Sequence, residues 1–369
     1  MSLILGVPNE VEYSTNWRCG ADFRAESELA YTQNEALEGV RLASSRAGNS
    51  VTCTTNGTRM GERASGSDLA IQARGPMEED IMADVYPVVA GTDGSVRAGA
   101  AVTQAAAEAG RRDLPLRLIY GFAPLYGYAG LDPTPPPDIL ESCQGVLDAE
   151  KTRLLKDFPE LDISTEVVVS DPSVALVKES SKATIMYVGA RGLGAVRRLL
   201  LGSVSSKVAA HSKCPVVVVR GTAGDERGPV VVGMSPEGGS QEAVNFAFEE
   251  ARRRGTGVRV IQSQQHAAAN FDTLPETAMR SIIASRMSEV ADRGRAAFDK
   301  IRQDYPDVEA TLDISMLHAV DALLEASNDA CITVVGSHGA GAMTAQLLGS
   351  VTHGVLTGAP IVAVIPKEV

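Results

Sequence analysis

The chain carries the stretch GARGLGAVRRLLLGS at residues 189–203 and the stretch GSHGAGAMTAQLLGS at residues 336–350. Both follow an apolar run typical of a buried strand, and both reduce to the pattern G-x2-G-x9-G-S, repeated 147 positions apart. Glycines at a strand-to-helix junction let backbone amides approach an anion without interference from a β-carbon, and the following helix dipole favours negative charge. The pattern therefore predicts a phosphate-binding loop that occurs twice through duplication of one module.

From residue 84 onward, short apolar runs alternate with longer helical stretches, which is typical of βαβ units around a parallel sheet. Strands are expected at residues 87–92, 115–121, 164–169, 184–189 and 215–220, and again at 229–234, 258–262, 310–314, 331–335 and 360–365. Helices are expected at 95–110, 138–158, 172–183, 240–254 and 276–304, and one is expected to begin at Ser203. The chain is therefore predicted to be an α/β protein with two tandem domains, 84–221 and 228–368, each built on a five-stranded parallel sheet.

Residues 1–82 differ from the rest of the chain. They are rich in Ser, Thr, Gly, Asn and Arg, and they show no sustained helical or strand period. A segment of this composition is expected to be a disordered, low-complexity extension. No function is assigned to it.

The chain of 369 residues has a formal net charge of −12, with 46 acidic against 34 basic side chains. Such a field repels nucleic acid and anionic membranes, so neither is an expected partner. No apolar stretch reaches the length of a membrane span, and no secretion signal is visible. The cysteines are scattered, without the spacing of a disulfide framework or a zinc site, at Cys19, Cys53, Cys143, Cys214 and Cys331. A cytoplasmic location is expected.

The first glycine motif carries further groups that suit phosphate. Ser203 and Ser205 place hydroxyls at the start of the following helix, which Ser203 is expected to cap. Arg191 lies in the loop, and Arg197 and Arg198 follow it, so this acidic chain has a local cluster of positive charge. Two other interpretations are open: the glycines serve only tight turns, and the arginines form a solvated face. Duplication of the motif favours phosphate binding over both.

Four segments together resemble the universal stress protein family. They are VVAGTDGS at 88–95, VGARGLG at 188–194, LLGSVS at 200–205 and CPVVVVR at 214–220, and both halves show the likeness across roughly residues 84 to 368. The resemblance is to the tandem two-domain type common in actinobacteria. It implies two Rossmann-like sandwich domains, related to the adenine nucleotide alpha hydrolase fold, and binding of ATP with Mg²⁺ by members that carry the glycine motif.

Carried onto this sequence, the resemblance implies that Asp93, after the first strand, contacts the nucleoside end of the ligand. Alone, an Asp before Gly would be read as a turn residue. The residues that match the phosphate-binding loop, together with the arginine inside it, are Gly189, Arg191, Gly192, Gly202, Ser203, Val204 and Ser205. Ligands of open α/β sheets bind outside the carboxyl ends of strands at a switch point, here expected between the first and fourth strands.

The second module departs from this pattern. Ser235 stands where Asp93 is expected, and His338 replaces Arg191, although Glu237 is a candidate substitute for the missing acid. The loop itself is intact, with Gly336, Gly339, Gly349, Ser350, Val351 and Thr352. Binding of ATP is therefore expected to be tighter at the first module and weak or absent at the second.

No catalytic residue and no metal ligand is assigned, because none of the five histidines has a metal-ligand spacing and no nucleophile elbow occurs. The favoured function is an ATP-binding sensor or regulator of a stress response, acting through nucleotide-dependent conformation or an unknown protein partner. Slow ATP hydrolysis or another adenine-nucleotide enzyme on the same fold, and an interaction scaffold without nucleotide, are the alternatives. The resemblance also implies that the apolar strands at 216–219 and 361–364 pair within the chain, and that two chains form a homodimer.

Overall fold

The computed structural model describes residues 40–43, 52–55, 58–60, 86–123, 135–192, 201–221, 227–235, 241–265, 276–337 and 348–367. The chain divides into two compact units, residues 1–83 and 84–369. In the first unit, the antiparallel strands β1 (Val40–Ala43), β2 (Thr52–Thr55) and β3 (Thr58–Met60) form a small sheet. The composition of this segment did not predict these strands.

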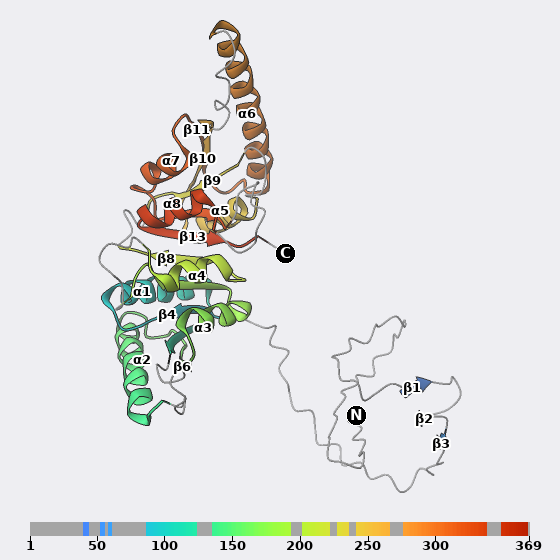
Figure 1. Ribbon diagram of the computed structural model, residues 1–369, viewed down its shortest axis with the longest axis vertical. Helices are drawn as coiled ribbons and strands as arrows, with labels where there is room; N and C mark the ends of the chain where they lie inside the picture. Colours follow the sequence, from blue (N-terminus) through green and yellow to red (C-terminus); the bar gives the residue numbers. More distant parts are fainter. Residues whose placement is uncertain are drawn as a thin grey trace. The chain divides into compact units, whose positions relative to one another are not determined.

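The second unit is built on one ten-stranded sheet, in the order β11-β10-β9-β12-β13-β8-β7-β4-β5-β6 (Figure 1). The first half of the chain supplies β4 (Val88–Gly91), β5 (Leu116–Phe122), β6 (Ile163–Val169), β7 (Ile185–Gly189) and β8 (Val216–Val219). The second half supplies β9 (Val230–Gly233), β10 (Val258–Ser263), β11 (Ala310–Ser315), β12 (Ile332–Gly336) and β13 (Ile361–Ile365). These ten strands confirm the predicted ones, with ends that differ by no more than one residue.

Helices cover both faces of this sheet. One face carries α1 (Val96–Arg112), α2 (Pro137–Asp157), α5 (Gln241–Arg254) and α6 (Glu276–Asp304). The other carries α3 (Pro172–Glu179), α4 (Ser203–His211), α7 (Ala319–Ala326) and α8 (Ser350–Gly358). The helix expected at 172–183 is divided, because α3 gives way to a 3₁₀ turn at Ser180–Lys182. No bounds were predicted for α7 and α8, and only the start was predicted for α4.

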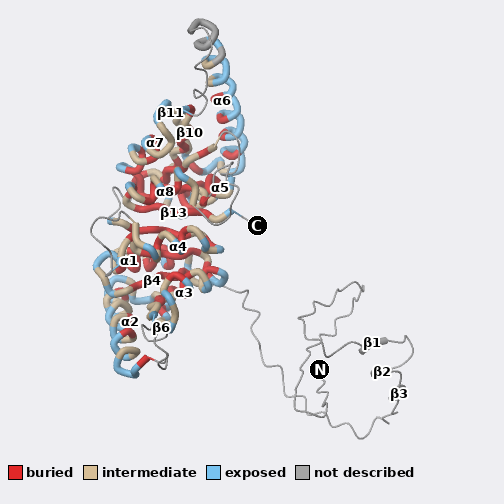
Figure 2. Tube along the Cα trace, viewed as in Figure 1, coloured by how far each residue is buried: buried red, intermediate tan, exposed pale blue. Residues whose placement is uncertain are grey.

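The valines of β8 show why the strands read as unbroken apolar runs. Val217 and Val219 belong to the core on one face of the sheet, whereas Val216 and Val218 belong to the core on the other. Successive side chains of a strand point to opposite faces, so a sheet covered by helices on both faces needs apolar residues at every position. Figure 2 shows the resulting band of buried residues along the central strands.

Strands β8 and β13 join the two halves of the sheet. They pair antiparallel, from Ile361 opposite Val219 to Val364 opposite Val216, whereas the other neighbouring strands of this sheet run parallel. The predicted pairing of these two strands within the chain is confirmed. Each half keeps the strand order 5-4-1-2-3, so the order reverses between its first and fourth strands.

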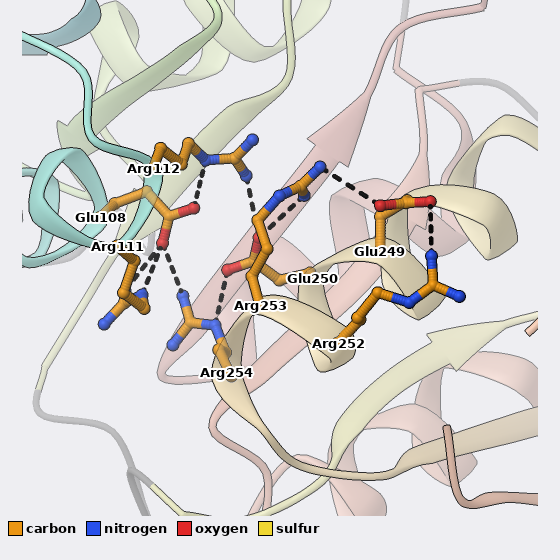
Figure 3. A network of polar contacts seen from close by, with 8 residues as sticks. All are labelled: Glu108, Arg111, Arg112, Glu249, Glu250, Arg252, Arg253 and Arg254. Atoms are coloured by element: carbon orange, nitrogen blue, oxygen red, sulfur yellow. Dashed lines mark hydrogen bonds and ion pairs between the residues drawn. The ribbon is translucent and has the colours of Figure 1, made fainter. Parts of the chain in front are cut away.

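A buried cluster of charged side chains also joins the halves (Figure 3). Glu108 on α1 and Glu250 on α5 are 0% and 1% exposed. Arg112 contacts Glu108 at 2.5 Å and Glu250 at 2.9 Å, and Arg254 contacts Glu250 at 2.5 Å and Glu108 at 3.3 Å. The arrangement is symmetric. Each of the two helix ends supplies one glutamate and one arginine, and each of these arginines contacts the glutamates of both modules.

Candidate functional site

A cavity of 330 Å³ lies at the carboxyl ends of β4, β5 and β7, where the strand order of the first module reverses. All the residues predicted for the first site line it: Asp93, Gly189, Arg191, Gly192, Gly202, Ser203, Val204 and Ser205. The fold thus brings Asp93 together with the segments 189–192 and 202–205, although 96 positions of sequence separate Asp93 from Gly189. Arg197 and Arg198, the other predicted cations, lie outside the described residues.

The walls of the cavity differ in chemistry according to the element that supplies them. Ile119 of β5 and Pro172 and Leu176 of α3 are apolar. The loops after β4 and β7 and the start of α4 supply backbone amides, the carboxylate of Asp93 and the guanidinium of Arg191. A ligand with a flat apolar group and an anionic group would find a suitable surface for each.

The first turn of α4 is open toward the cavity. Its N-cap is Gly202, not Ser203 as predicted, and no side chain of the described residues caps it. By contrast, Ser95 caps α1 by accepting from the Ala98 amide at 3.2 Å, and Asp171 caps α3 by accepting from the Ser173 amide at 2.9 Å. Because glycine brings no capping oxygen, the first amides of α4 are left for an external acceptor.

The buried hydroxyl of Ser205 fixes α4 against the loop. Its oxygen lies 3.1 Å from the carbonyl of Ala190 and 3.0 Å from that of Gly202, the two acceptors that its single proton can reach, and the Gly202 amide donates to the Ala190 carbonyl at 2.8 Å. The Ser203 side chain, in contrast, is exposed. Ser205 therefore positions the loop, and Ser203 is the hydroxyl directed to solvent.

Two glycines of the motif lie in close contact with neighbouring groups. A β-carbon at Gly189 would lie 3.1 Å from the Arg97 carbonyl and 3.2 Å from the Ala98 amide, so glycine lets β7 approach α1. A β-carbon at Gly192 would collide with Oδ2 of Asp93, whose Oδ1 accepts from the Ser95 amide at 3.0 Å. The carboxylate of Asp93 thus reaches from its own turn to the glycine loop, which a turn residue alone would not do.

Positive charge gathers beside the cavity. Burial lowers the pKa of Arg220, and the nearby charges of Arg191 and Arg97 lower it further. Arg97 lies in the first turn of α1, and Arg220 directly follows β8. Because like charges in a partly buried region repel, an anion beside Arg191 would stabilise all three.

The second module repeats the loop geometry. Helix α8 begins after Gly349, again with no capping side chain among the described residues, and the Gly349 amide donates to the Ser337 carbonyl at 3.0 Å. The Thr352 hydroxyl, at the position of Ser205, donates to the Gly336 carbonyl at 2.6 Å, one residue before the counterpart of the Ala190 carbonyl that Ser205 contacts. Ser350 and Val351 occupy the first turn of α8. Gly339, His338 and Glu237 lie outside the described residues, and Ser235 follows β9 where Asp93 follows β4.

Comparison with known proteins identifies the family. The sequence profile of the universal stress protein family matches residues 86–220 and again residues 226–366. The chain belongs to the universal stress protein family. A universal stress protein of Mycolicibacterium smegmatis is 32% identical over 299 residues, covering 76% of this chain and 98% of the relative. Universal stress protein Rv2005c of Mycobacterium tuberculosis is 30% identical over 295 residues, covering 77% and 97%.

Among solved structures, a universal stress protein from Archaeoglobus fulgidus shares the fold. Its TM-score is 0.52 at 18% identity, and the match covers 76% of this chain and 96% of that chain. The two tandem α/β domains predicted for this universal stress protein are therefore confirmed as its fold class.

Sequence reasoning missed two residues of this universal stress protein that lie beside the first site, Arg97 and Arg220. Arg97 comes four residues after Asp93, and Arg220 ends the apolar run of the last strand, so both could have been found from the edge of the sheet at which they fall. In the described part of the chain, no three His, Cys, Asp or Glu side chains gather as metal ligands would. The described helices also include none with the length and apolar character that crossing a membrane requires.

Proposed function

We propose that this universal stress protein binds ATP in its first module and acts as a stress-response sensor or regulator, through nucleotide-dependent conformation or binding of a protein partner. The observation that carries the proposal is the uncapped start of α4, which opens onto a cavity that also holds Asp93 and Arg191. A helix N-terminus with bare glycine amides is suited to phosphate, and the adjoining guanidinium supplies compensating charge.

The remaining walls suit the other parts of the ligand. The apolar surface of Ile119, Pro172 and Leu176 fits a purine base, and the carboxylate of Asp93 can accept hydrogen bonds from ribose hydroxyls. Mg²⁺ fits as an ion carried by the nucleotide, since it is usually held by phosphate oxygens, water and at most one or two carboxylates. When bound, Mg²⁺ would neutralise phosphate charge. The carboxylate of Asp93 and the hydroxyl of Ser203 are the side-chain oxygens of the cavity that would coordinate it.

The second module is proposed to bind nucleotide more weakly. Its loop and the start of α8 repeat the donor geometry, but Ser235 supplies no carboxylate at the end of β9. Loss of one charged acceptor for a ligand hydroxyl lowers affinity by about tenfold. The first module is therefore the principal site in this proposal.

A regulatory role is favoured over catalysis by the lining of the cavity. Among its described residues, Asp93 is the only carboxylate and there is no histidine. Hydrolysis needs a base or a water-positioning group beside the terminal phosphate, and Asp93 is engaged with the Ser95 amide and the glycine loop. The alternatives to be tested are slow hydrolysis of ATP and an interaction scaffold that binds no nucleotide.

The proposal places the protein in the cytoplasm as a homodimer with domains 84–221 and 228–368. The described cysteines, Cys143, Cys214 and Cys331, are free and buried, which suits a reducing compartment.

Native mass spectrometry of the purified protein, combined with a phosphate-release assay, tests the function. We expect adenine nucleotide to be retained or readily taken up, with phosphate release no faster than the uncatalysed background. Phosphate release above background that disappears in the Asp93→Asn variant would establish an ATPase instead. A protein that takes up no adenylate, with or without Mg²⁺, would be a scaffold and would overturn the proposal.

A further inference from the structure

Arg220 and Arg191 lie side by side at the edge of the sheet that holds the cavity. In the register of β7 and β8, Gly189 is opposite Val219, and the Ala190 amide donates to the Val219 carbonyl at 2.8 Å. The residues that follow these paired strands are therefore neighbours. Arg191 lines the cavity, whereas Arg220 follows the neighbouring strand β8 and contacts the second module.

Arg97 brings a third positive charge to the same place. It lies in the first turn of α1, and its carbonyl is in contact with Gly189 at the end of β7. The two neighbouring guanidinium charges disfavour the charged form of Arg220, in addition to its burial. Like charges of this kind repel one another, and an anion with several charges beside Arg191 would reduce the repulsion.

On its other side, Arg220 holds the second module. Its guanidinium Nη2 donates to the carbonyl of Leu356, in the last turn of α8, and its backbone amide donates to the Pro360 carbonyl at 2.8 Å. A cation at the carboxyl end of a helix also stabilises the helix dipole. Helix α8 begins at the second glycine motif, so a side chain close to Arg191 of the first cavity also contacts the helix that follows the second loop.

The connection runs in one direction. The Ser337 amide donates to the Ile365 carbonyl as the Ala190 amide donates to the Val219 carbonyl, so Pro366 corresponds to Arg220. Pro366 carries no charge, whereas Arg220 is partly buried and contacts the second module. The duplicated modules therefore differ at this position as well as at Asp93.

We propose that Arg220 makes the first site selective for nucleotides that carry more than one phosphate, and that it links occupation of this site to helix α8 of the second module. The inference rests on the proposed binding of ATP in the first cavity. A polyphosphate beside Arg191 offers Arg220 a charge-assisted contact, which is stronger than its bond to the neutral Leu356 carbonyl. Binding of ATP then weakens the hydrogen bond from Arg220 to the Leu356 carbonyl in the last turn of α8, whereas binding of AMP leaves this bond intact.

Titration calorimetry with ATP and AMP tests the selectivity in the full-length chain. We expect Arg220→Gln to lower affinity for ATP about tenfold, the loss of one charge-assisted contact, and to leave AMP within about twofold of the wild type. Arg220→Lys, which keeps the charge, should retain most of the preference for ATP. Arg295→Gln is the matched control, because it removes one positive charge from an exposed ion pair on α6.

Hydrogen–deuterium exchange of residues 350–358 tests the link to α8. ATP should increase exchange near Leu356 in the wild type and in Arg295→Gln, and AMP should not. In Arg220→Gln, exchange there should be high without nucleotide and unchanged by ATP.

The two proposals fail in different ways. A wild-type protein that binds no ATP contradicts the proposed function itself. A wild type that binds ATP, together with an Arg220→Gln variant that loses ATP and AMP equally or loses neither, overturns only the role of Arg220. If Arg220→Gln does not fold, Arg220→Lys provides the test. An Arg220→Lys variant that loses its preference for ATP over AMP, although it keeps the positive charge, would also overturn the role of Arg220.

Discussion

At the scale of single residues, the two modules differ most clearly at the position after the first strand. Asp93 reaches from the end of β4 to Gly192, so that its carboxylate and the glycine loop border the same cavity. Ser235 at the equivalent point of the second module is shorter and uncharged. The difference between a carboxylate and a hydroxyl at this point should decide which module binds nucleotide more tightly.

Replacing Asp93 by asparagine keeps the size of the side chain and removes its charge. We expect Asp93→Asn to weaken ATP binding about tenfold, because a hydrogen bond from ribose to a charged acceptor contributes on the order of 1.4 kcal/mol or more. Ser235→Asn, the matched change in the second module, should leave the tight site unaffected. Calorimetric titration of both variants is the measurement, and equal losses in the two would contradict the assignment.

At the scale of helices and strands, the glycine motif determines how closely neighbouring elements approach. Gly189 lets the end of β7 lie against the backbone of α1, and Gly202 starts α4 without a capping side chain. Helices α1, α3 and α7 have side-chain caps, from Ser95, Asp171 and His318. Helix α2 also has no capping side chain among the described residues, but it begins at Pro136–Pro137, whereas the helices of the two glycine motifs begin at glycine, and α4 does so at the point where a ligand is proposed.

Gly189→Ala should destabilise the first module, because the added β-carbon meets backbone atoms of Arg97 and Ala98, which cannot rotate away. A cost of about 1–3 kcal/mol in the free energy of unfolding is typical of such overpacking. Gly145→Ala, on an exposed part of α2 with open space around it, should instead stabilise by up to about 1 kcal/mol. Urea denaturation measures the free energy of unfolding of both variants. If Gly189→Ala is as stable as the wild type, β7 and α1 can move apart to accept the added β-carbon, which would contradict the prediction.

Strands and most helices could be predicted because a sheet buried on both faces requires unbroken apolar runs, and β8 is an example. The cap of α4 was predicted wrongly because Ser203 follows a glycine that itself occupies the N-cap position. The resemblance predicted the pairing of β8 with β13, and the pairing of β7 with β8 places Arg220 at the edge of the sheet beside Arg191. The contact of its guanidinium with the Leu356 carbonyl could not be predicted, because it depends on how α8 packs beside the last strand of the first module.

At the scale of the whole second unit, the buried charge cluster holds the two modules in one register. The repeat E-x2-R-R occurs at residues 108–112 and again at 250–254, at the carboxyl ends of α1 and α5. In a single sequence such a helix end is typical of a solvated surface. Only the pairing of β8 with β13 brings the two copies together and buries them, so that each arginine contacts the glutamate of the other module.

Removing Glu108 should destabilise the junction in a manner that depends on pH. Burial opposes ionisation of Glu108, but the charges of Arg112, Arg111 and Arg254 outweigh it and lower its pKa from the usual 4.5 to about 2. Because the pKa is lower in the folded chain, ionised Glu108 stabilises the fold above about pH 4.5, and this stabilisation is lost as the pH falls toward 2. Glu108→Gln should therefore lower the free energy of unfolding by about 3 kcal/mol near neutral pH.

Urea denaturation at a series of pH values down to about pH 3 measures this effect. The difference between Glu108→Gln and the wild type should shrink as the pH falls, because the wild type loses the contribution of the ionised carboxylate. Glu160→Gln, an exposed position, serves as the control and should change stability by less than about 0.5 kcal/mol. A difference that stays constant with pH would contradict the role given to the ionised form.

The most direct measurement of the central claim is a calorimetric titration of ATP with Mg²⁺ into the wild-type chain and into Gly192→Val and Gly349→Val. If the first module binds the nucleotide, the wild type should show one strong site per chain. This site should be lost in Gly192→Val, where the new side chain would displace the Asp93 carboxylate, and it should be kept in Gly349→Val. No measurable binding by the wild type, or an equal loss in the two variants, would contradict it.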